Sequence, residues 1–555
     1  MLHQWKEQIV YQIYPRSFKD SNHDGIGDIP GIIEKLDYLK KLGVTMLWVC
    51  PVYRSPMADN GYDISDYYDI NPEFGTMADV DRLIAEAKKR DMYVIMDLVI
   101  NHTSDEHAWF QEALKDPQSP YRDYYIFKEG KDGHAPTNWR SVFGGSVWEP
   151  VPGEDNMYYF HAFAKKQPDL NWENPKMRQN IYQMINFWLE KGIAGFRVDA
   201  INFMKKNQDW PDGKPDGADG LSACFPFSRN VPGIEVFFKE LRENTFDKYQ
   251  CFTVAEAVGV AYDKLDIFIG DTGCFNMLFD FSYANLDVTE NEEWFPLQNW
   301  TIKAFKEALY ASQVELAKVG WNAPFFENHD MQRSMNRLIR NEEERTSTAA
   351  KMLGALLLSL KGTPFIYQGE EIGMINNERS DISEFDDISS HNQYQRALEE
   401  GYTEKEALMF VNRRSRDNTR SPMCFDDSEY AGFSDVKPWL KVNEHASTIN
   451  VASQLDDPNS VFNFYVKMIA LRQSEAYHDT FVDGDFVVEP EVAENVIAFS
   501  RKLDNTHLLC VYNFQNEAMS YPLSGNPECL LSNEEVEIDH QMVHLKPYQA
   551  CIFKM

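Results

Sequence analysis

Cysteine is scarce and scattered in this chain of 555 residues. The eight cysteines stand alone, without C-x-x-C pairs or neighbouring histidine clusters, at positions 50, 224, 251, 274, 424, 510, 529 and 551. Disulfide frameworks and structural zinc sites need cysteines at short, regular spacing, so isolated thiols are typical of a reduced cytosolic protein. We therefore expect neither zinc nor a disulfide framework, and we predict a cytoplasmic location.

Basic charge and long apolar runs are lacking as well. The chain has 54 basic and 87 acidic residues, a formal net charge of −33. Such a charge repels nucleic acid and acidic membrane surfaces, favours a neutral substrate and keeps a concentrated protein soluble. No apolar run approaches membrane-spanning length, and the start, MLHQWKEQIVYQIYP, is not that of a secretory signal. We expect no nucleic-acid or membrane partner, and a monomer or small homo-oligomer.

Short β-rich segments alternate with longer amphipathic segments along most of the chain. Helical spacing is clear in GIIEKLDYLKKLG from Gly31, VDRLIAEAKKR, RQNIYQMINFWLEKG, IEVFFKELREN and AAKMLGALLLSLKG. An alternation of this length predicts a parallel (β/α)8 TIM barrel, whose ligand site lies at the carboxyl ends of its strands. An open doubly wound sheet is the alternative, but no Gly-rich phosphate turn follows the first strand. The expected strands begin at Ile9, Val44, Tyr93, Gly195, Phe252, Asn276, Ala323 and Pro364.

Two regions depart from this alternation. Residues 104–173, after the third expected strand, are rich in Trp, Tyr, Gly and Pro, which predicts an inserted lobe over the ligand site. Residues 479–555 contain short strand-like pieces such as VIAFSRK and HLLCVYNF, which predict a small antiparallel β-domain. The barrel itself is then expected to comprise residues 1–103 and 174–478.

Three acidic residues stand at the ends of otherwise apolar strands: Asp199 in GFRVDAIN, Glu256 in VAEA and Asp330 in ENHD. A carboxylate at the end of a buried strand is costly unless its charge is paired or used. Any one of them alone could be a structural, ion-paired carboxylate. Because all three come from separate strands of one barrel, a shared chemical function is the better interpretation.

Glycoside hydrolysis requires carboxyl groups that lie close together, as these three are expected to do. One carboxylate acts as nucleophile and one carboxylic acid protonates the leaving oxygen, at a separation of roughly 5 Å in retaining enzymes. Asp199 and Glu256 suit these tasks, and Arg197 lies on the same side of its strand as Asp199, where it can keep that carboxylate ionised. His102 and His329 also end strands, beside Asn101 and Asp330, in positions from which they could bond sugar hydroxyls. A lone histidine there would more often be structural, but the pairing with the acids favours a role in binding.

The strand-end motifs DLVINH, GFRVDAIN, VAEA and ENHD resemble the conserved regions of the α-amylase superfamily, glycoside hydrolase family 13. QIYPRSF, DNGYDISDY, KKQPDLNW, KGTPFIYQGEEIGM and SRDNTRSPM are similar to motifs of one subgroup, which contains oligo-1,6-glucosidases, α-glucosidases, dextran glucosidases and trehalose-6-phosphate hydrolases. Each motif is weak alone, but their order and spacing extend over the whole chain and are specific.

The resemblance implies a role for each residue of the site. Asp199 would be the nucleophile, Glu256 the general acid/base, and Asp330 the acid that holds the distorted sugar. Asp59 and Arg416 would close the glucose pocket at its far end, which implies exo-action on the non-reducing end of a small oligosaccharide. The residues implied to line the pocket are Asp59, Tyr62, His102, Phe143, Gln167, Arg197, Ala200, His329 and Arg416.

The segment DSNHDGIGD places oxygen-bearing residues at alternating positions around a turn at Gly25. It imitates the first nine positions of a calcium loop, although Gly31 at the twelfth position excludes an EF-hand. A solvated acidic turn is the alternative, but the subgroup resemblance also implies a structural metal here, and an irregular oxygen cage suits Ca²⁺ better than Mg²⁺. The expected ligands are Asp20, Asn22, Asp24, Asp28 and the carbonyl of Ile26.

Some positions depart from the subgroup and bear on specificity. Cys424-Phe425 stands where Gln-Trp is usual, and FDFSYANLD differs from the FQFEH pattern associated with oligo-1,6-glucosidases. Ala200 follows the nucleophile, where a Val is associated with α-1,6 preference, whereas QPDLN resembles the oligo-1,6-glucosidase signature. Since Ala200 lies nearer the scissile bond, we expect α-1,4 activity with α-1,6 activity alongside it.

Four other functions compete with a retaining, exo-acting α-glucosidase. An oligo-1,6-glucosidase proper and a trehalose-6-phosphate hydrolase remain alternatives within the subgroup. A sucrose isomerase is disfavoured because no Arg-rich isomerase-type motif occurs around MQRSMNRLIR. A non-catalytic sugar-binding protein on the same fold would be indicated by loss of a catalytic acid, and all three acids are present.

Overall fold

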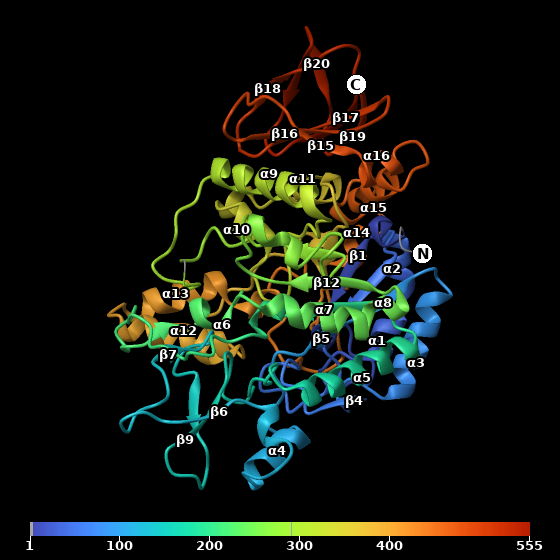
Figure 1. Cartoon of the computed structure of the whole chain (residues 1–555). Helices are drawn as coiled ribbons and strands as arrows, with labels where there is room; N and C mark the ends of the chain where they lie inside the picture. Colours follow the sequence, from blue (N-terminus) through green and yellow to red (C-terminus); the bar gives the residue numbers. More distant parts are fainter. Residues whose placement is uncertain (1–3, 290) are drawn as a thin grey trace.

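The computed structural model describes residues 4–289 and 291–555. Its centre is a curled sheet of seven parallel strands in the order β13-β12-β10-β5-β2-β1-β14 (Figure 1). Each strand lies where the sequence predicts one, and the polar strand ends gather at one edge of the sheet. The strands are β1 (Val10–Ile13), β2 (Met46–Val49), β5 (Tyr93–Val99), β10 (Gly195–Asp199), β12 (Phe252–Glu256), β13 (Met277–Phe279) and β14 (Phe365–Tyr367).

The segment expected to form the seventh barrel strand, from Ala323, is irregular. It makes one parallel bridge to β13, between Asn322 and Leu278, and one to β14, between Phe325 and Phe365. Pro324 lies between the two bridges and has no N–H group to donate, so a continuous ladder cannot form there. The segment nevertheless joins the two edges of the curled sheet, which closes the predicted barrel.

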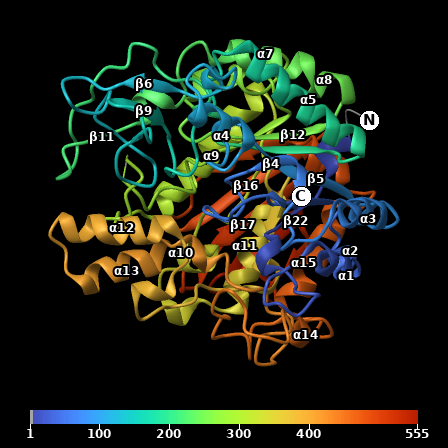
Figure 2. The same cartoon turned by 90° about the horizontal axis from the view of Figure 1, so that it is seen from below.

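Helices surround the sheet and mostly follow the expected periodicity (Figure 2). The helix expected from Gly31 is instead two short helices, interrupted at Lys35, where the backbone leaves the helical region. α11 is buried along almost its whole length, as is typical of a helix that is apolar on all sides. The helices are α1 (Ile29–Glu34), α2 (Leu36–Leu42), α3 (Met77–Lys88), α5 (Pro175–Lys191), α7 (Ile234–Asn244), α8 (Phe246–Tyr249), α9 (Ile302–Val319), α11 (Ser347–Ser359) and α15 (Val461–Arg472).

A lobe follows β5, at the opposite end of the molecule from the C-terminal strands (Figure 1). It contains α4 (Ala108–Lys115) and a three-stranded sheet of β6 (Phe127–Glu129), β9 (Met157–Phe160) and β8 (Trp148–Pro150). Its β7 (Trp139–Arg140) pairs with β11 (Ser222–Ala223), which follows β10. A second stretch of chain therefore packs with the lobe, which the predicted limits of 104–173 do not include.

The C-terminal region is formed by antiparallel strands in two sheets, as predicted. The expected limit at residue 479 falls within α16 (His478–Val482), directly before the first of these strands. α11 packs between this region and the barrel, against α15, β17 and β22. The strands are β15 (Asp485–Val488), β16 (Val496–Leu503), β17 (Thr506–Asn513), β18 (Met519–Pro522), β19 (Glu528–Ser532), β20 (Glu537–Asp539), β21 (Met542–Leu545) and β22 (Ala550–Lys554).

A helical hairpin lies beside the lobe, formed by α12 (Ile388–Glu399) and α13 (Glu404–Arg414) (Figures 1 and 2). The backbone N–H of Ala218 donates to Glu400 at 2.9 Å, and Arg396 pairs with Glu293 at 2.6 Å. The second contact ties the hairpin to the segment of residues 292–294, which borders the ligand cavity. The sequence did not predict this hairpin.

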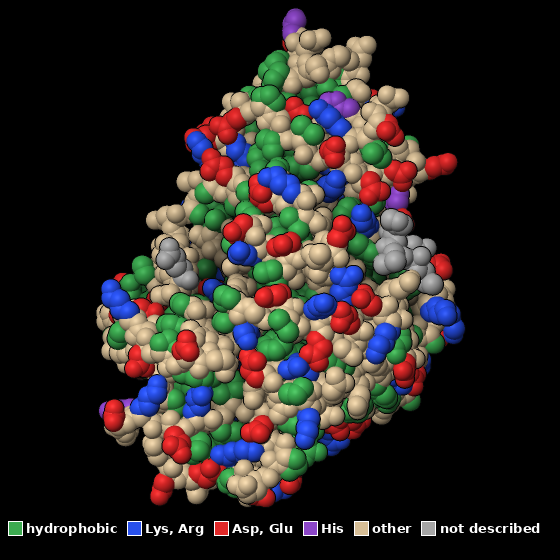
Figure 3. Space-filling model, in the orientation of Figure 1, with side chains coloured by type: hydrophobic (Ala, Val, Ile, Leu, Met, Phe, Trp, Pro, Cys, Tyr) green, Lys and Arg blue, Asp and Glu red, His purple; other side chains and the backbone are tan. Residues whose placement is uncertain are grey.

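The surface carries both signs of charge. Figure 3 shows acidic and basic side chains interspersed over one face of the molecule. All eight cysteines are free thiols. Within the described residues, none of the helices combines the length and the apolar character needed to cross a bilayer.

Candidate active site

A cavity of about 200 Å³ opens at the carboxyl ends of the barrel strands. Asp199, Glu256 and Asp330 line it, on β10, on β12 and after the irregular seventh segment. Arg197, Gln167 and His329 lie beneath it and are fully buried. The structure thus brings all the predicted sugar-site residues together. The other predicted residues that line the cavity are Asp59, Tyr62, His102, Phe143, Ala200 and Arg416.

One guanidinium organises the acidic groups of this cavity. The pairing of β10 with β5 sets Arg197 opposite Asp97, and the two side chains form a buried ion pair. Arg197 Nη1 donates to Asp199 Oδ1 at 2.7 Å, and Nη2 lies 2.7 Å from Glu256 Oε1. Because both carboxylates contact the same planar cation, they are held close together, as double-displacement glycoside hydrolysis requires.

Arg197 was expected to keep Asp199 ionised, but it divides its charge among three carboxylates. Burial raises the pKa of Asp199 well above its usual value, Arg197 lowers it, and the charges of Glu256 and Asp97 raise it again. Burial also raises the pKa of Glu256, against the lowering effect of Arg197. Two close acids in this environment titrate as a pair that retains a proton, which is what a general acid beside a nucleophile needs.

Ala200 contributes through its backbone as well as its small side chain. Its N–H donates to Glu256 Oε2 at 2.9 Å, so the residue after the nucleophile also orients the acid. Its φ of 40° lies in the left-handed region, which few residues other than glycine adopt easily. The tight turn therefore links β10 and β12 at the point where their carboxylates meet.

Asp330 is surrounded by cationic and imidazole groups. Arg420 Nη2 donates to Asp330 Oδ1 at 2.8 Å, Arg416 Nη1 lies 3.2 Å from the same oxygen, and His329 Nε2 lies 3.1 Å from Oδ2. Burial raises the pKa of Asp330, but His329, Arg416 and Arg420 outweigh it and hold that pKa below its usual value. Asp330 is therefore ionised and can accept hydrogen bonds from sugar hydroxyls.

The far end of the cavity is closed by a network around Arg416. Arg416 Nη2 lies 3.0 Å from Asp59 Oδ1 and 2.7 Å from Asp387 Oδ1. Gln167 Nε2, from the lobe, donates to Asp59 Oδ2 at 3.0 Å. The Arg416 guanidinium lies over the ring of Phe143, with its central carbon 5.0 Å from the ring centroid. The cavity thus ends at these side chains, and a chain of sugars cannot pass through it.

The floor of the cavity is aromatic. Tyr62 stacks on His329, with ring centroids 5.1 Å apart and planes inclined by 8°. Its hydroxyl donates to Asp97 Oδ2 at 3.1 Å, which fixes the ring. Burial lowers the pKa of His102 and of His329, so both imidazoles are neutral. A rigid ring face beside neutral donors and acceptors suits a sugar ring.

Several residues of the site were not singled out from the sequence. Asp97 stands in the middle of an apolar strand, in DLVINH, and this position was a usable signal. Arg420 lies in SRDNTRSPM, the same motif as Arg416, so its place in that motif was a usable signal as well. Asp387 has no comparable signal. The ammonium of Lys206 lies 2.6 Å from Asp169 Oδ2 and binds the lobe to the barrel beside the cavity.

The open side of the cavity would receive the second sugar. Apolar side chains border it, among them Phe163, Phe203, Val258 and Phe281. Its basic side chains each face an acid: Arg229 Nη1 lies 2.5 Å from Glu292 Oε1, and Arg414 Nη1 lies 3.6 Å from Asp287 Oδ1. This side therefore offers no uncompensated positive charge to a substrate.

The expected calcium loop is a series of side-chain-to-backbone turns. Asp20 Oδ1 accepts from the N–H groups of Asn22 and His23, and its Oδ2 accepts from Gly25 N at 2.9 Å. Asp28 Oδ1 accepts from Gly31 N and caps α1. Within the described residues no three His, Cys, Asp or Glu side chains gather as a metal site, so a cation here would also depend on the Asn22 amide and the Ile26 carbonyl. These hard oxygen donors fit Ca²⁺.

A closed sugar-sized pocket with three carboxylates at the strand ends of a barrel is the site of a glycoside hydrolase. The chain belongs to the α-amylase family: residues 12–482 match the alpha amylase catalytic domain, and residues 487–552 match the maltogenic amylase C-terminal domain. It is 44% identical to an oligo-1,6-glucosidase of Parageobacillus thermoglucosidasius, over 99% of both chains. A trehalose-6-phosphate hydrolase of Bacillus subtilis is 40% identical, over 99% of this chain and 98% of the other. The crystal structure of isomaltulose synthase from Klebsiella sp. LX3 superposes with a TM-score of 0.93, at 39% identity and 99% coverage of both chains.

Proposed function

We propose that the protein is a retaining, exo-acting α-glucosidase that releases α-glucose from the non-reducing end of short oligosaccharides. The observation that carries this proposal is the closed pocket: Arg416 and Asp59 end it on one side, and Asp199 and Glu256 stand at its open side. A pocket of this shape accepts one terminal sugar and presents its glycosidic bond to the two acids. The glucosidase names of the similar proteins support glucose as that sugar.

The reaction would proceed in two displacements. Glu256 donates its proton to the glycosidic oxygen while Asp199 attacks the anomeric carbon, and the C–O bond to the leaving sugar breaks. A covalent glucosyl ester on Asp199 results. Glu256, now a carboxylate, then takes a proton from water, whose oxygen attacks the anomeric carbon and frees Asp199. Asp330 would hold the sugar hydroxyls in the distorted geometry of both transition states.

Linkage preference is proposed from the residue next to the nucleophile. Ala200 presents only a methyl group to the open side of the cavity, so the second sugar has room for the α-1,4 geometry. The relatives named as oligo-1,6-glucosidases support α-1,6 activity as well. We therefore expect hydrolysis of both linkages, with oligo-1,6-glucosidase activity proper as the alternative.

The other functions of the subgroup are less favoured. A phosphorylated disaccharide would bring its phosphate to the open side, where Arg229 and Arg414 are already matched by Glu292 and Asp287. Phosphate recognition needs arginines whose charge is available. Isomerisation of sucrose would require the released sugar to be retained and attacked, for which the sequence shows no isomerase-type motif.

The test is a substrate panel of maltose, isomaltose, sucrose, trehalose 6-phosphate and dextran, assayed for released glucose. We expect release from maltose and isomaltose. Proton NMR during the first turnovers should show the α-anomer, because two displacements retain configuration. Initial β-glucose would contradict the role of Asp199, and activity confined to trehalose 6-phosphate or sucrose would contradict the proposed substrate.

A structural calcium and a cytoplasmic location are also proposed. Ca²⁺ would be held by Asp20, Asn22, Asp24, Asp28 and the Ile26 carbonyl, and its binding to the native state alone would stabilise that state. Elemental analysis should find the metal, and its removal should lower the melting temperature more than the activity at moderate temperature. If the metal-free protein and the calcium-loaded protein had the same melting curve, the site would be excluded. Isolated reduced thiols support the location.

A further inference from the structure

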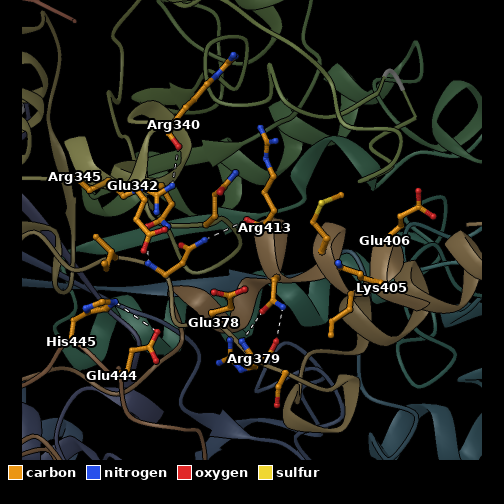
Figure 4. Close-up of a pocket in the computed structure, with 18 of the residues that line it drawn as sticks. Arg340, Glu342, Arg345, Glu378, Arg379, Lys405, Glu406, Arg413, Glu444 and His445 are labelled. Atoms are coloured by element: carbon orange, nitrogen blue, oxygen red, sulfur yellow. Dashed lines mark hydrogen bonds and ion pairs between the residues drawn. The ribbon is translucent and has the colours of Figure 1, made fainter. Parts of the chain in front are cut away.

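The largest cavity of the structure, about 1020 Å³, is bordered by α10 (Ser334–Leu338) and α13. Basic and acidic side chains are interspersed along its wall (Figure 4). Arg345 donates to the carbonyls of Ile339 and Arg340, at 3.0 and 3.2 Å, and Arg340 donates to the carbonyl of Trp300. These guanidinium groups therefore bind the backbone around them and do not converge on a ligand.

A smaller groove, about 450 Å³ in volume, continues from the open side of the sugar pocket. Its walls include residues 257–262, which follow Glu256, and residues 278–282, at the end of β13. The residues that line both the groove and the pocket are Arg229, Val258, Phe281, Asn285, Val288 and Glu292. Because Arg416 and Asp59 close the opposite end of the pocket, the groove lies on the side of the leaving sugar.

One wall of the groove carries a carboxylate that has no cationic partner. The hydroxyl of Tyr262, from the 3₁₀ helix η5 (Tyr262–Ile267), donates to Asp280 Oδ2 at 3.0 Å. The Ser282 N–H donates to Asp280 Oδ1 at 2.9 Å. Among the described residues, no Lys, Arg or His nitrogen lies within 4.0 Å of this carboxylate, and Asp280 is only half-buried. Each of its oxygens accepts one hydrogen bond and keeps room for another from a ligand.

The rest of the groove suits a neutral ligand that carries hydroxyl groups. Arg229, which lines the groove, is matched by Glu292, with Nη1 and Oε1 2.5 Å apart. The Asp280 carboxylate accepts hydrogen bonds from hydroxyls, whereas it repels a phosphate or a second carboxylate. Val260 and Leu265 add apolar surface, against which the C–H groups of a sugar ring can pack.

The polar residues of this groove lie in a segment that is particular to this chain. Asp280 and Ser282 belong to FDFSYANLD, which departs from the FQFEH pattern of oligo-1,6-glucosidases. They stand where that pattern has glutamine and glutamate. The departure therefore falls in the groove on the leaving-sugar side, and not among the three carboxylates of the pocket.

We propose that the groove binds the third sugar of a linear gluco-oligosaccharide, whose hydroxyls donate hydrogen bonds to Asp280. This binding site presupposes the proposed hydrolytic function and specifies its substrate, a trisaccharide or longer chain in preference to a disaccharide. The volume lies within the range for small-ligand sites, about 300–1,000 Å³. A sugar held this far from the scissile bond binds equally in the ground state and the transition state, so it lowers KM and leaves kcat unchanged.

The test compares initial rates on maltose and maltotriose, and on isomaltose and isomaltotriose, in the linkage series that the enzyme cleaves faster. The KM of the wild type should be roughly tenfold lower for the trisaccharide than for the disaccharide, as one hydrogen bond to a charged group provides. Asp280→Ala should remove this difference by raising only the KM for the trisaccharide. Tyr262→Phe, which removes the hydroxyl that holds the carboxylate, should raise the same KM by roughly threefold.

Asp263→Ala is the matched control, because Asp263 is an exposed aspartate next to Tyr262 that does not line the groove. It should keep the wild-type KM for both substrates. Turnover of the disaccharide checks that each variant is folded. Equal KM values of the wild type for the two substrates, or a wild-type trisaccharide KM in both Asp280→Ala and Tyr262→Phe, would exclude the third-sugar site while the proposed function stands. Cleavage of neither linkage series would overturn the proposed function, and the site with it.

Discussion

Asp199 and Glu256 share one cation, Arg197, yet the reaction requires them to behave differently. The difference cannot come from Arg197, which contacts each of them at 2.7 Å. The difference comes from the other surroundings of each carboxylate. Glu256 also accepts a hydrogen bond from the Ala200 N–H, whereas Asp199 stands at the end of its strand and faces the cavity. The two roles can be separated by varying the leaving group of the substrate.

The first prediction concerns these roles. Asp199→Ala should lower kcat by roughly 10³-fold or more on every substrate, because no covalent intermediate can form. Glu256→Gln should lower kcat by about 10²- to 10⁴-fold on maltose but much less on a nitrophenyl α-glucoside, whose leaving group needs little protonation. Initial rates on both substrates measure this. Glu243→Gln, an exposed glutamate, is the control, and equal losses on both substrates for Glu256→Gln would contradict its role as acid.

The second prediction concerns linkage. Ala200→Val places two more methyl groups beside the scissile bond and should shift the maltose-to-isomaltose ratio of kcat/KM toward isomaltose by about 1–3 kcal/mol. A β-branched side chain at the φ of 40° found here is strained, so the variant should also be less stable. The lower stability does not affect the maltose-to-isomaltose ratio, because both rates are measured on the same preparation of the variant. An unchanged ratio would contradict the linkage argument.

At this scale the sequence predicts positions better than it predicts interactions. Alternation along a strand placed Arg197 beside Asp199, and the structure shows that contact. The ion pair with Asp97 depends on the register between β5 and β10, which no pattern within one strand can reveal. The bond from Ala200 N–H to Glu256 depends on a left-handed turn at a residue that is not glycine, and propensity argues against such a turn.

At the scale of elements, the lobe is joined to the barrel by a buried ion pair. Lys206, in the connection after β10, contacts Asp169 of the lobe at 2.6 Å and donates to Asn101 Oδ1, at the end of β5, at 2.9 Å. Asp169 is fully buried and Lys206 nearly so. The pair therefore sets the position of the lobe, and with it Gln167 and Phe143, relative to the pocket.

The third prediction follows from this pair. Lys206→Met leaves Asp169 charged and buried without its partner and should lower the free energy of unfolding by about 3–5 kcal/mol. It should also raise KM, since the lobe contributes Gln167. The neighbouring Lys205 pairs with Glu173 near the surface, so Lys205→Met should cost only about 0–1 kcal/mol. Urea denaturation measures both, and equal losses for the two lysines would contradict the argument.

Element prediction succeeded where one chain segment carries the whole signal. Helices such as α5 and α11 lie where their periodicity indicates. The irregular seventh strand follows from Pro324, a residue within the expected strand that cannot donate a ladder hydrogen bond. The pairing of β7 with β11 and the α12–α13 hairpin depend on contacts between distant segments, for which local patterns hold no information.

At the scale of the whole molecule, buried acids that follow the last barrel strand make stability depend on pH. Glu370 and Glu371 follow β14 and are almost inaccessible to solvent. Tyr465 donates to Glu370 at 3.2 Å, and Tyr11 donates to Glu371 at 2.7 Å. Burial raises the pKa of both groups. The net charge of −33 shows that acidic residues outnumber basic ones, but composition cannot tell which of the acids are buried.

The last prediction tests this pH dependence at Glu370. Burial, followed by the charge of Glu327, raises its pKa well above the ordinary 4.5, so the folded protein keeps a proton that the unfolded chain releases. The stability linked to that proton is complete below pH 4.5 and is lost as the pH rises through the folded-state pKa. Gln carries no charge at any pH, so the melting temperature of Glu370→Gln minus that of the wild type should be more positive at pH 8 than at pH 5. Each pH unit over which only the folded protein holds the proton changes the difference in unfolding free energy between variant and wild type by about 1.4 kcal/mol, and the melting temperatures follow that change. Other titrating groups cancel in the comparison, and Glu243→Gln, at an exposed position, provides a control that should show no such trend. A difference that is constant with pH, or that decreases toward pH 8, would show that Glu370 is charged in the folded protein.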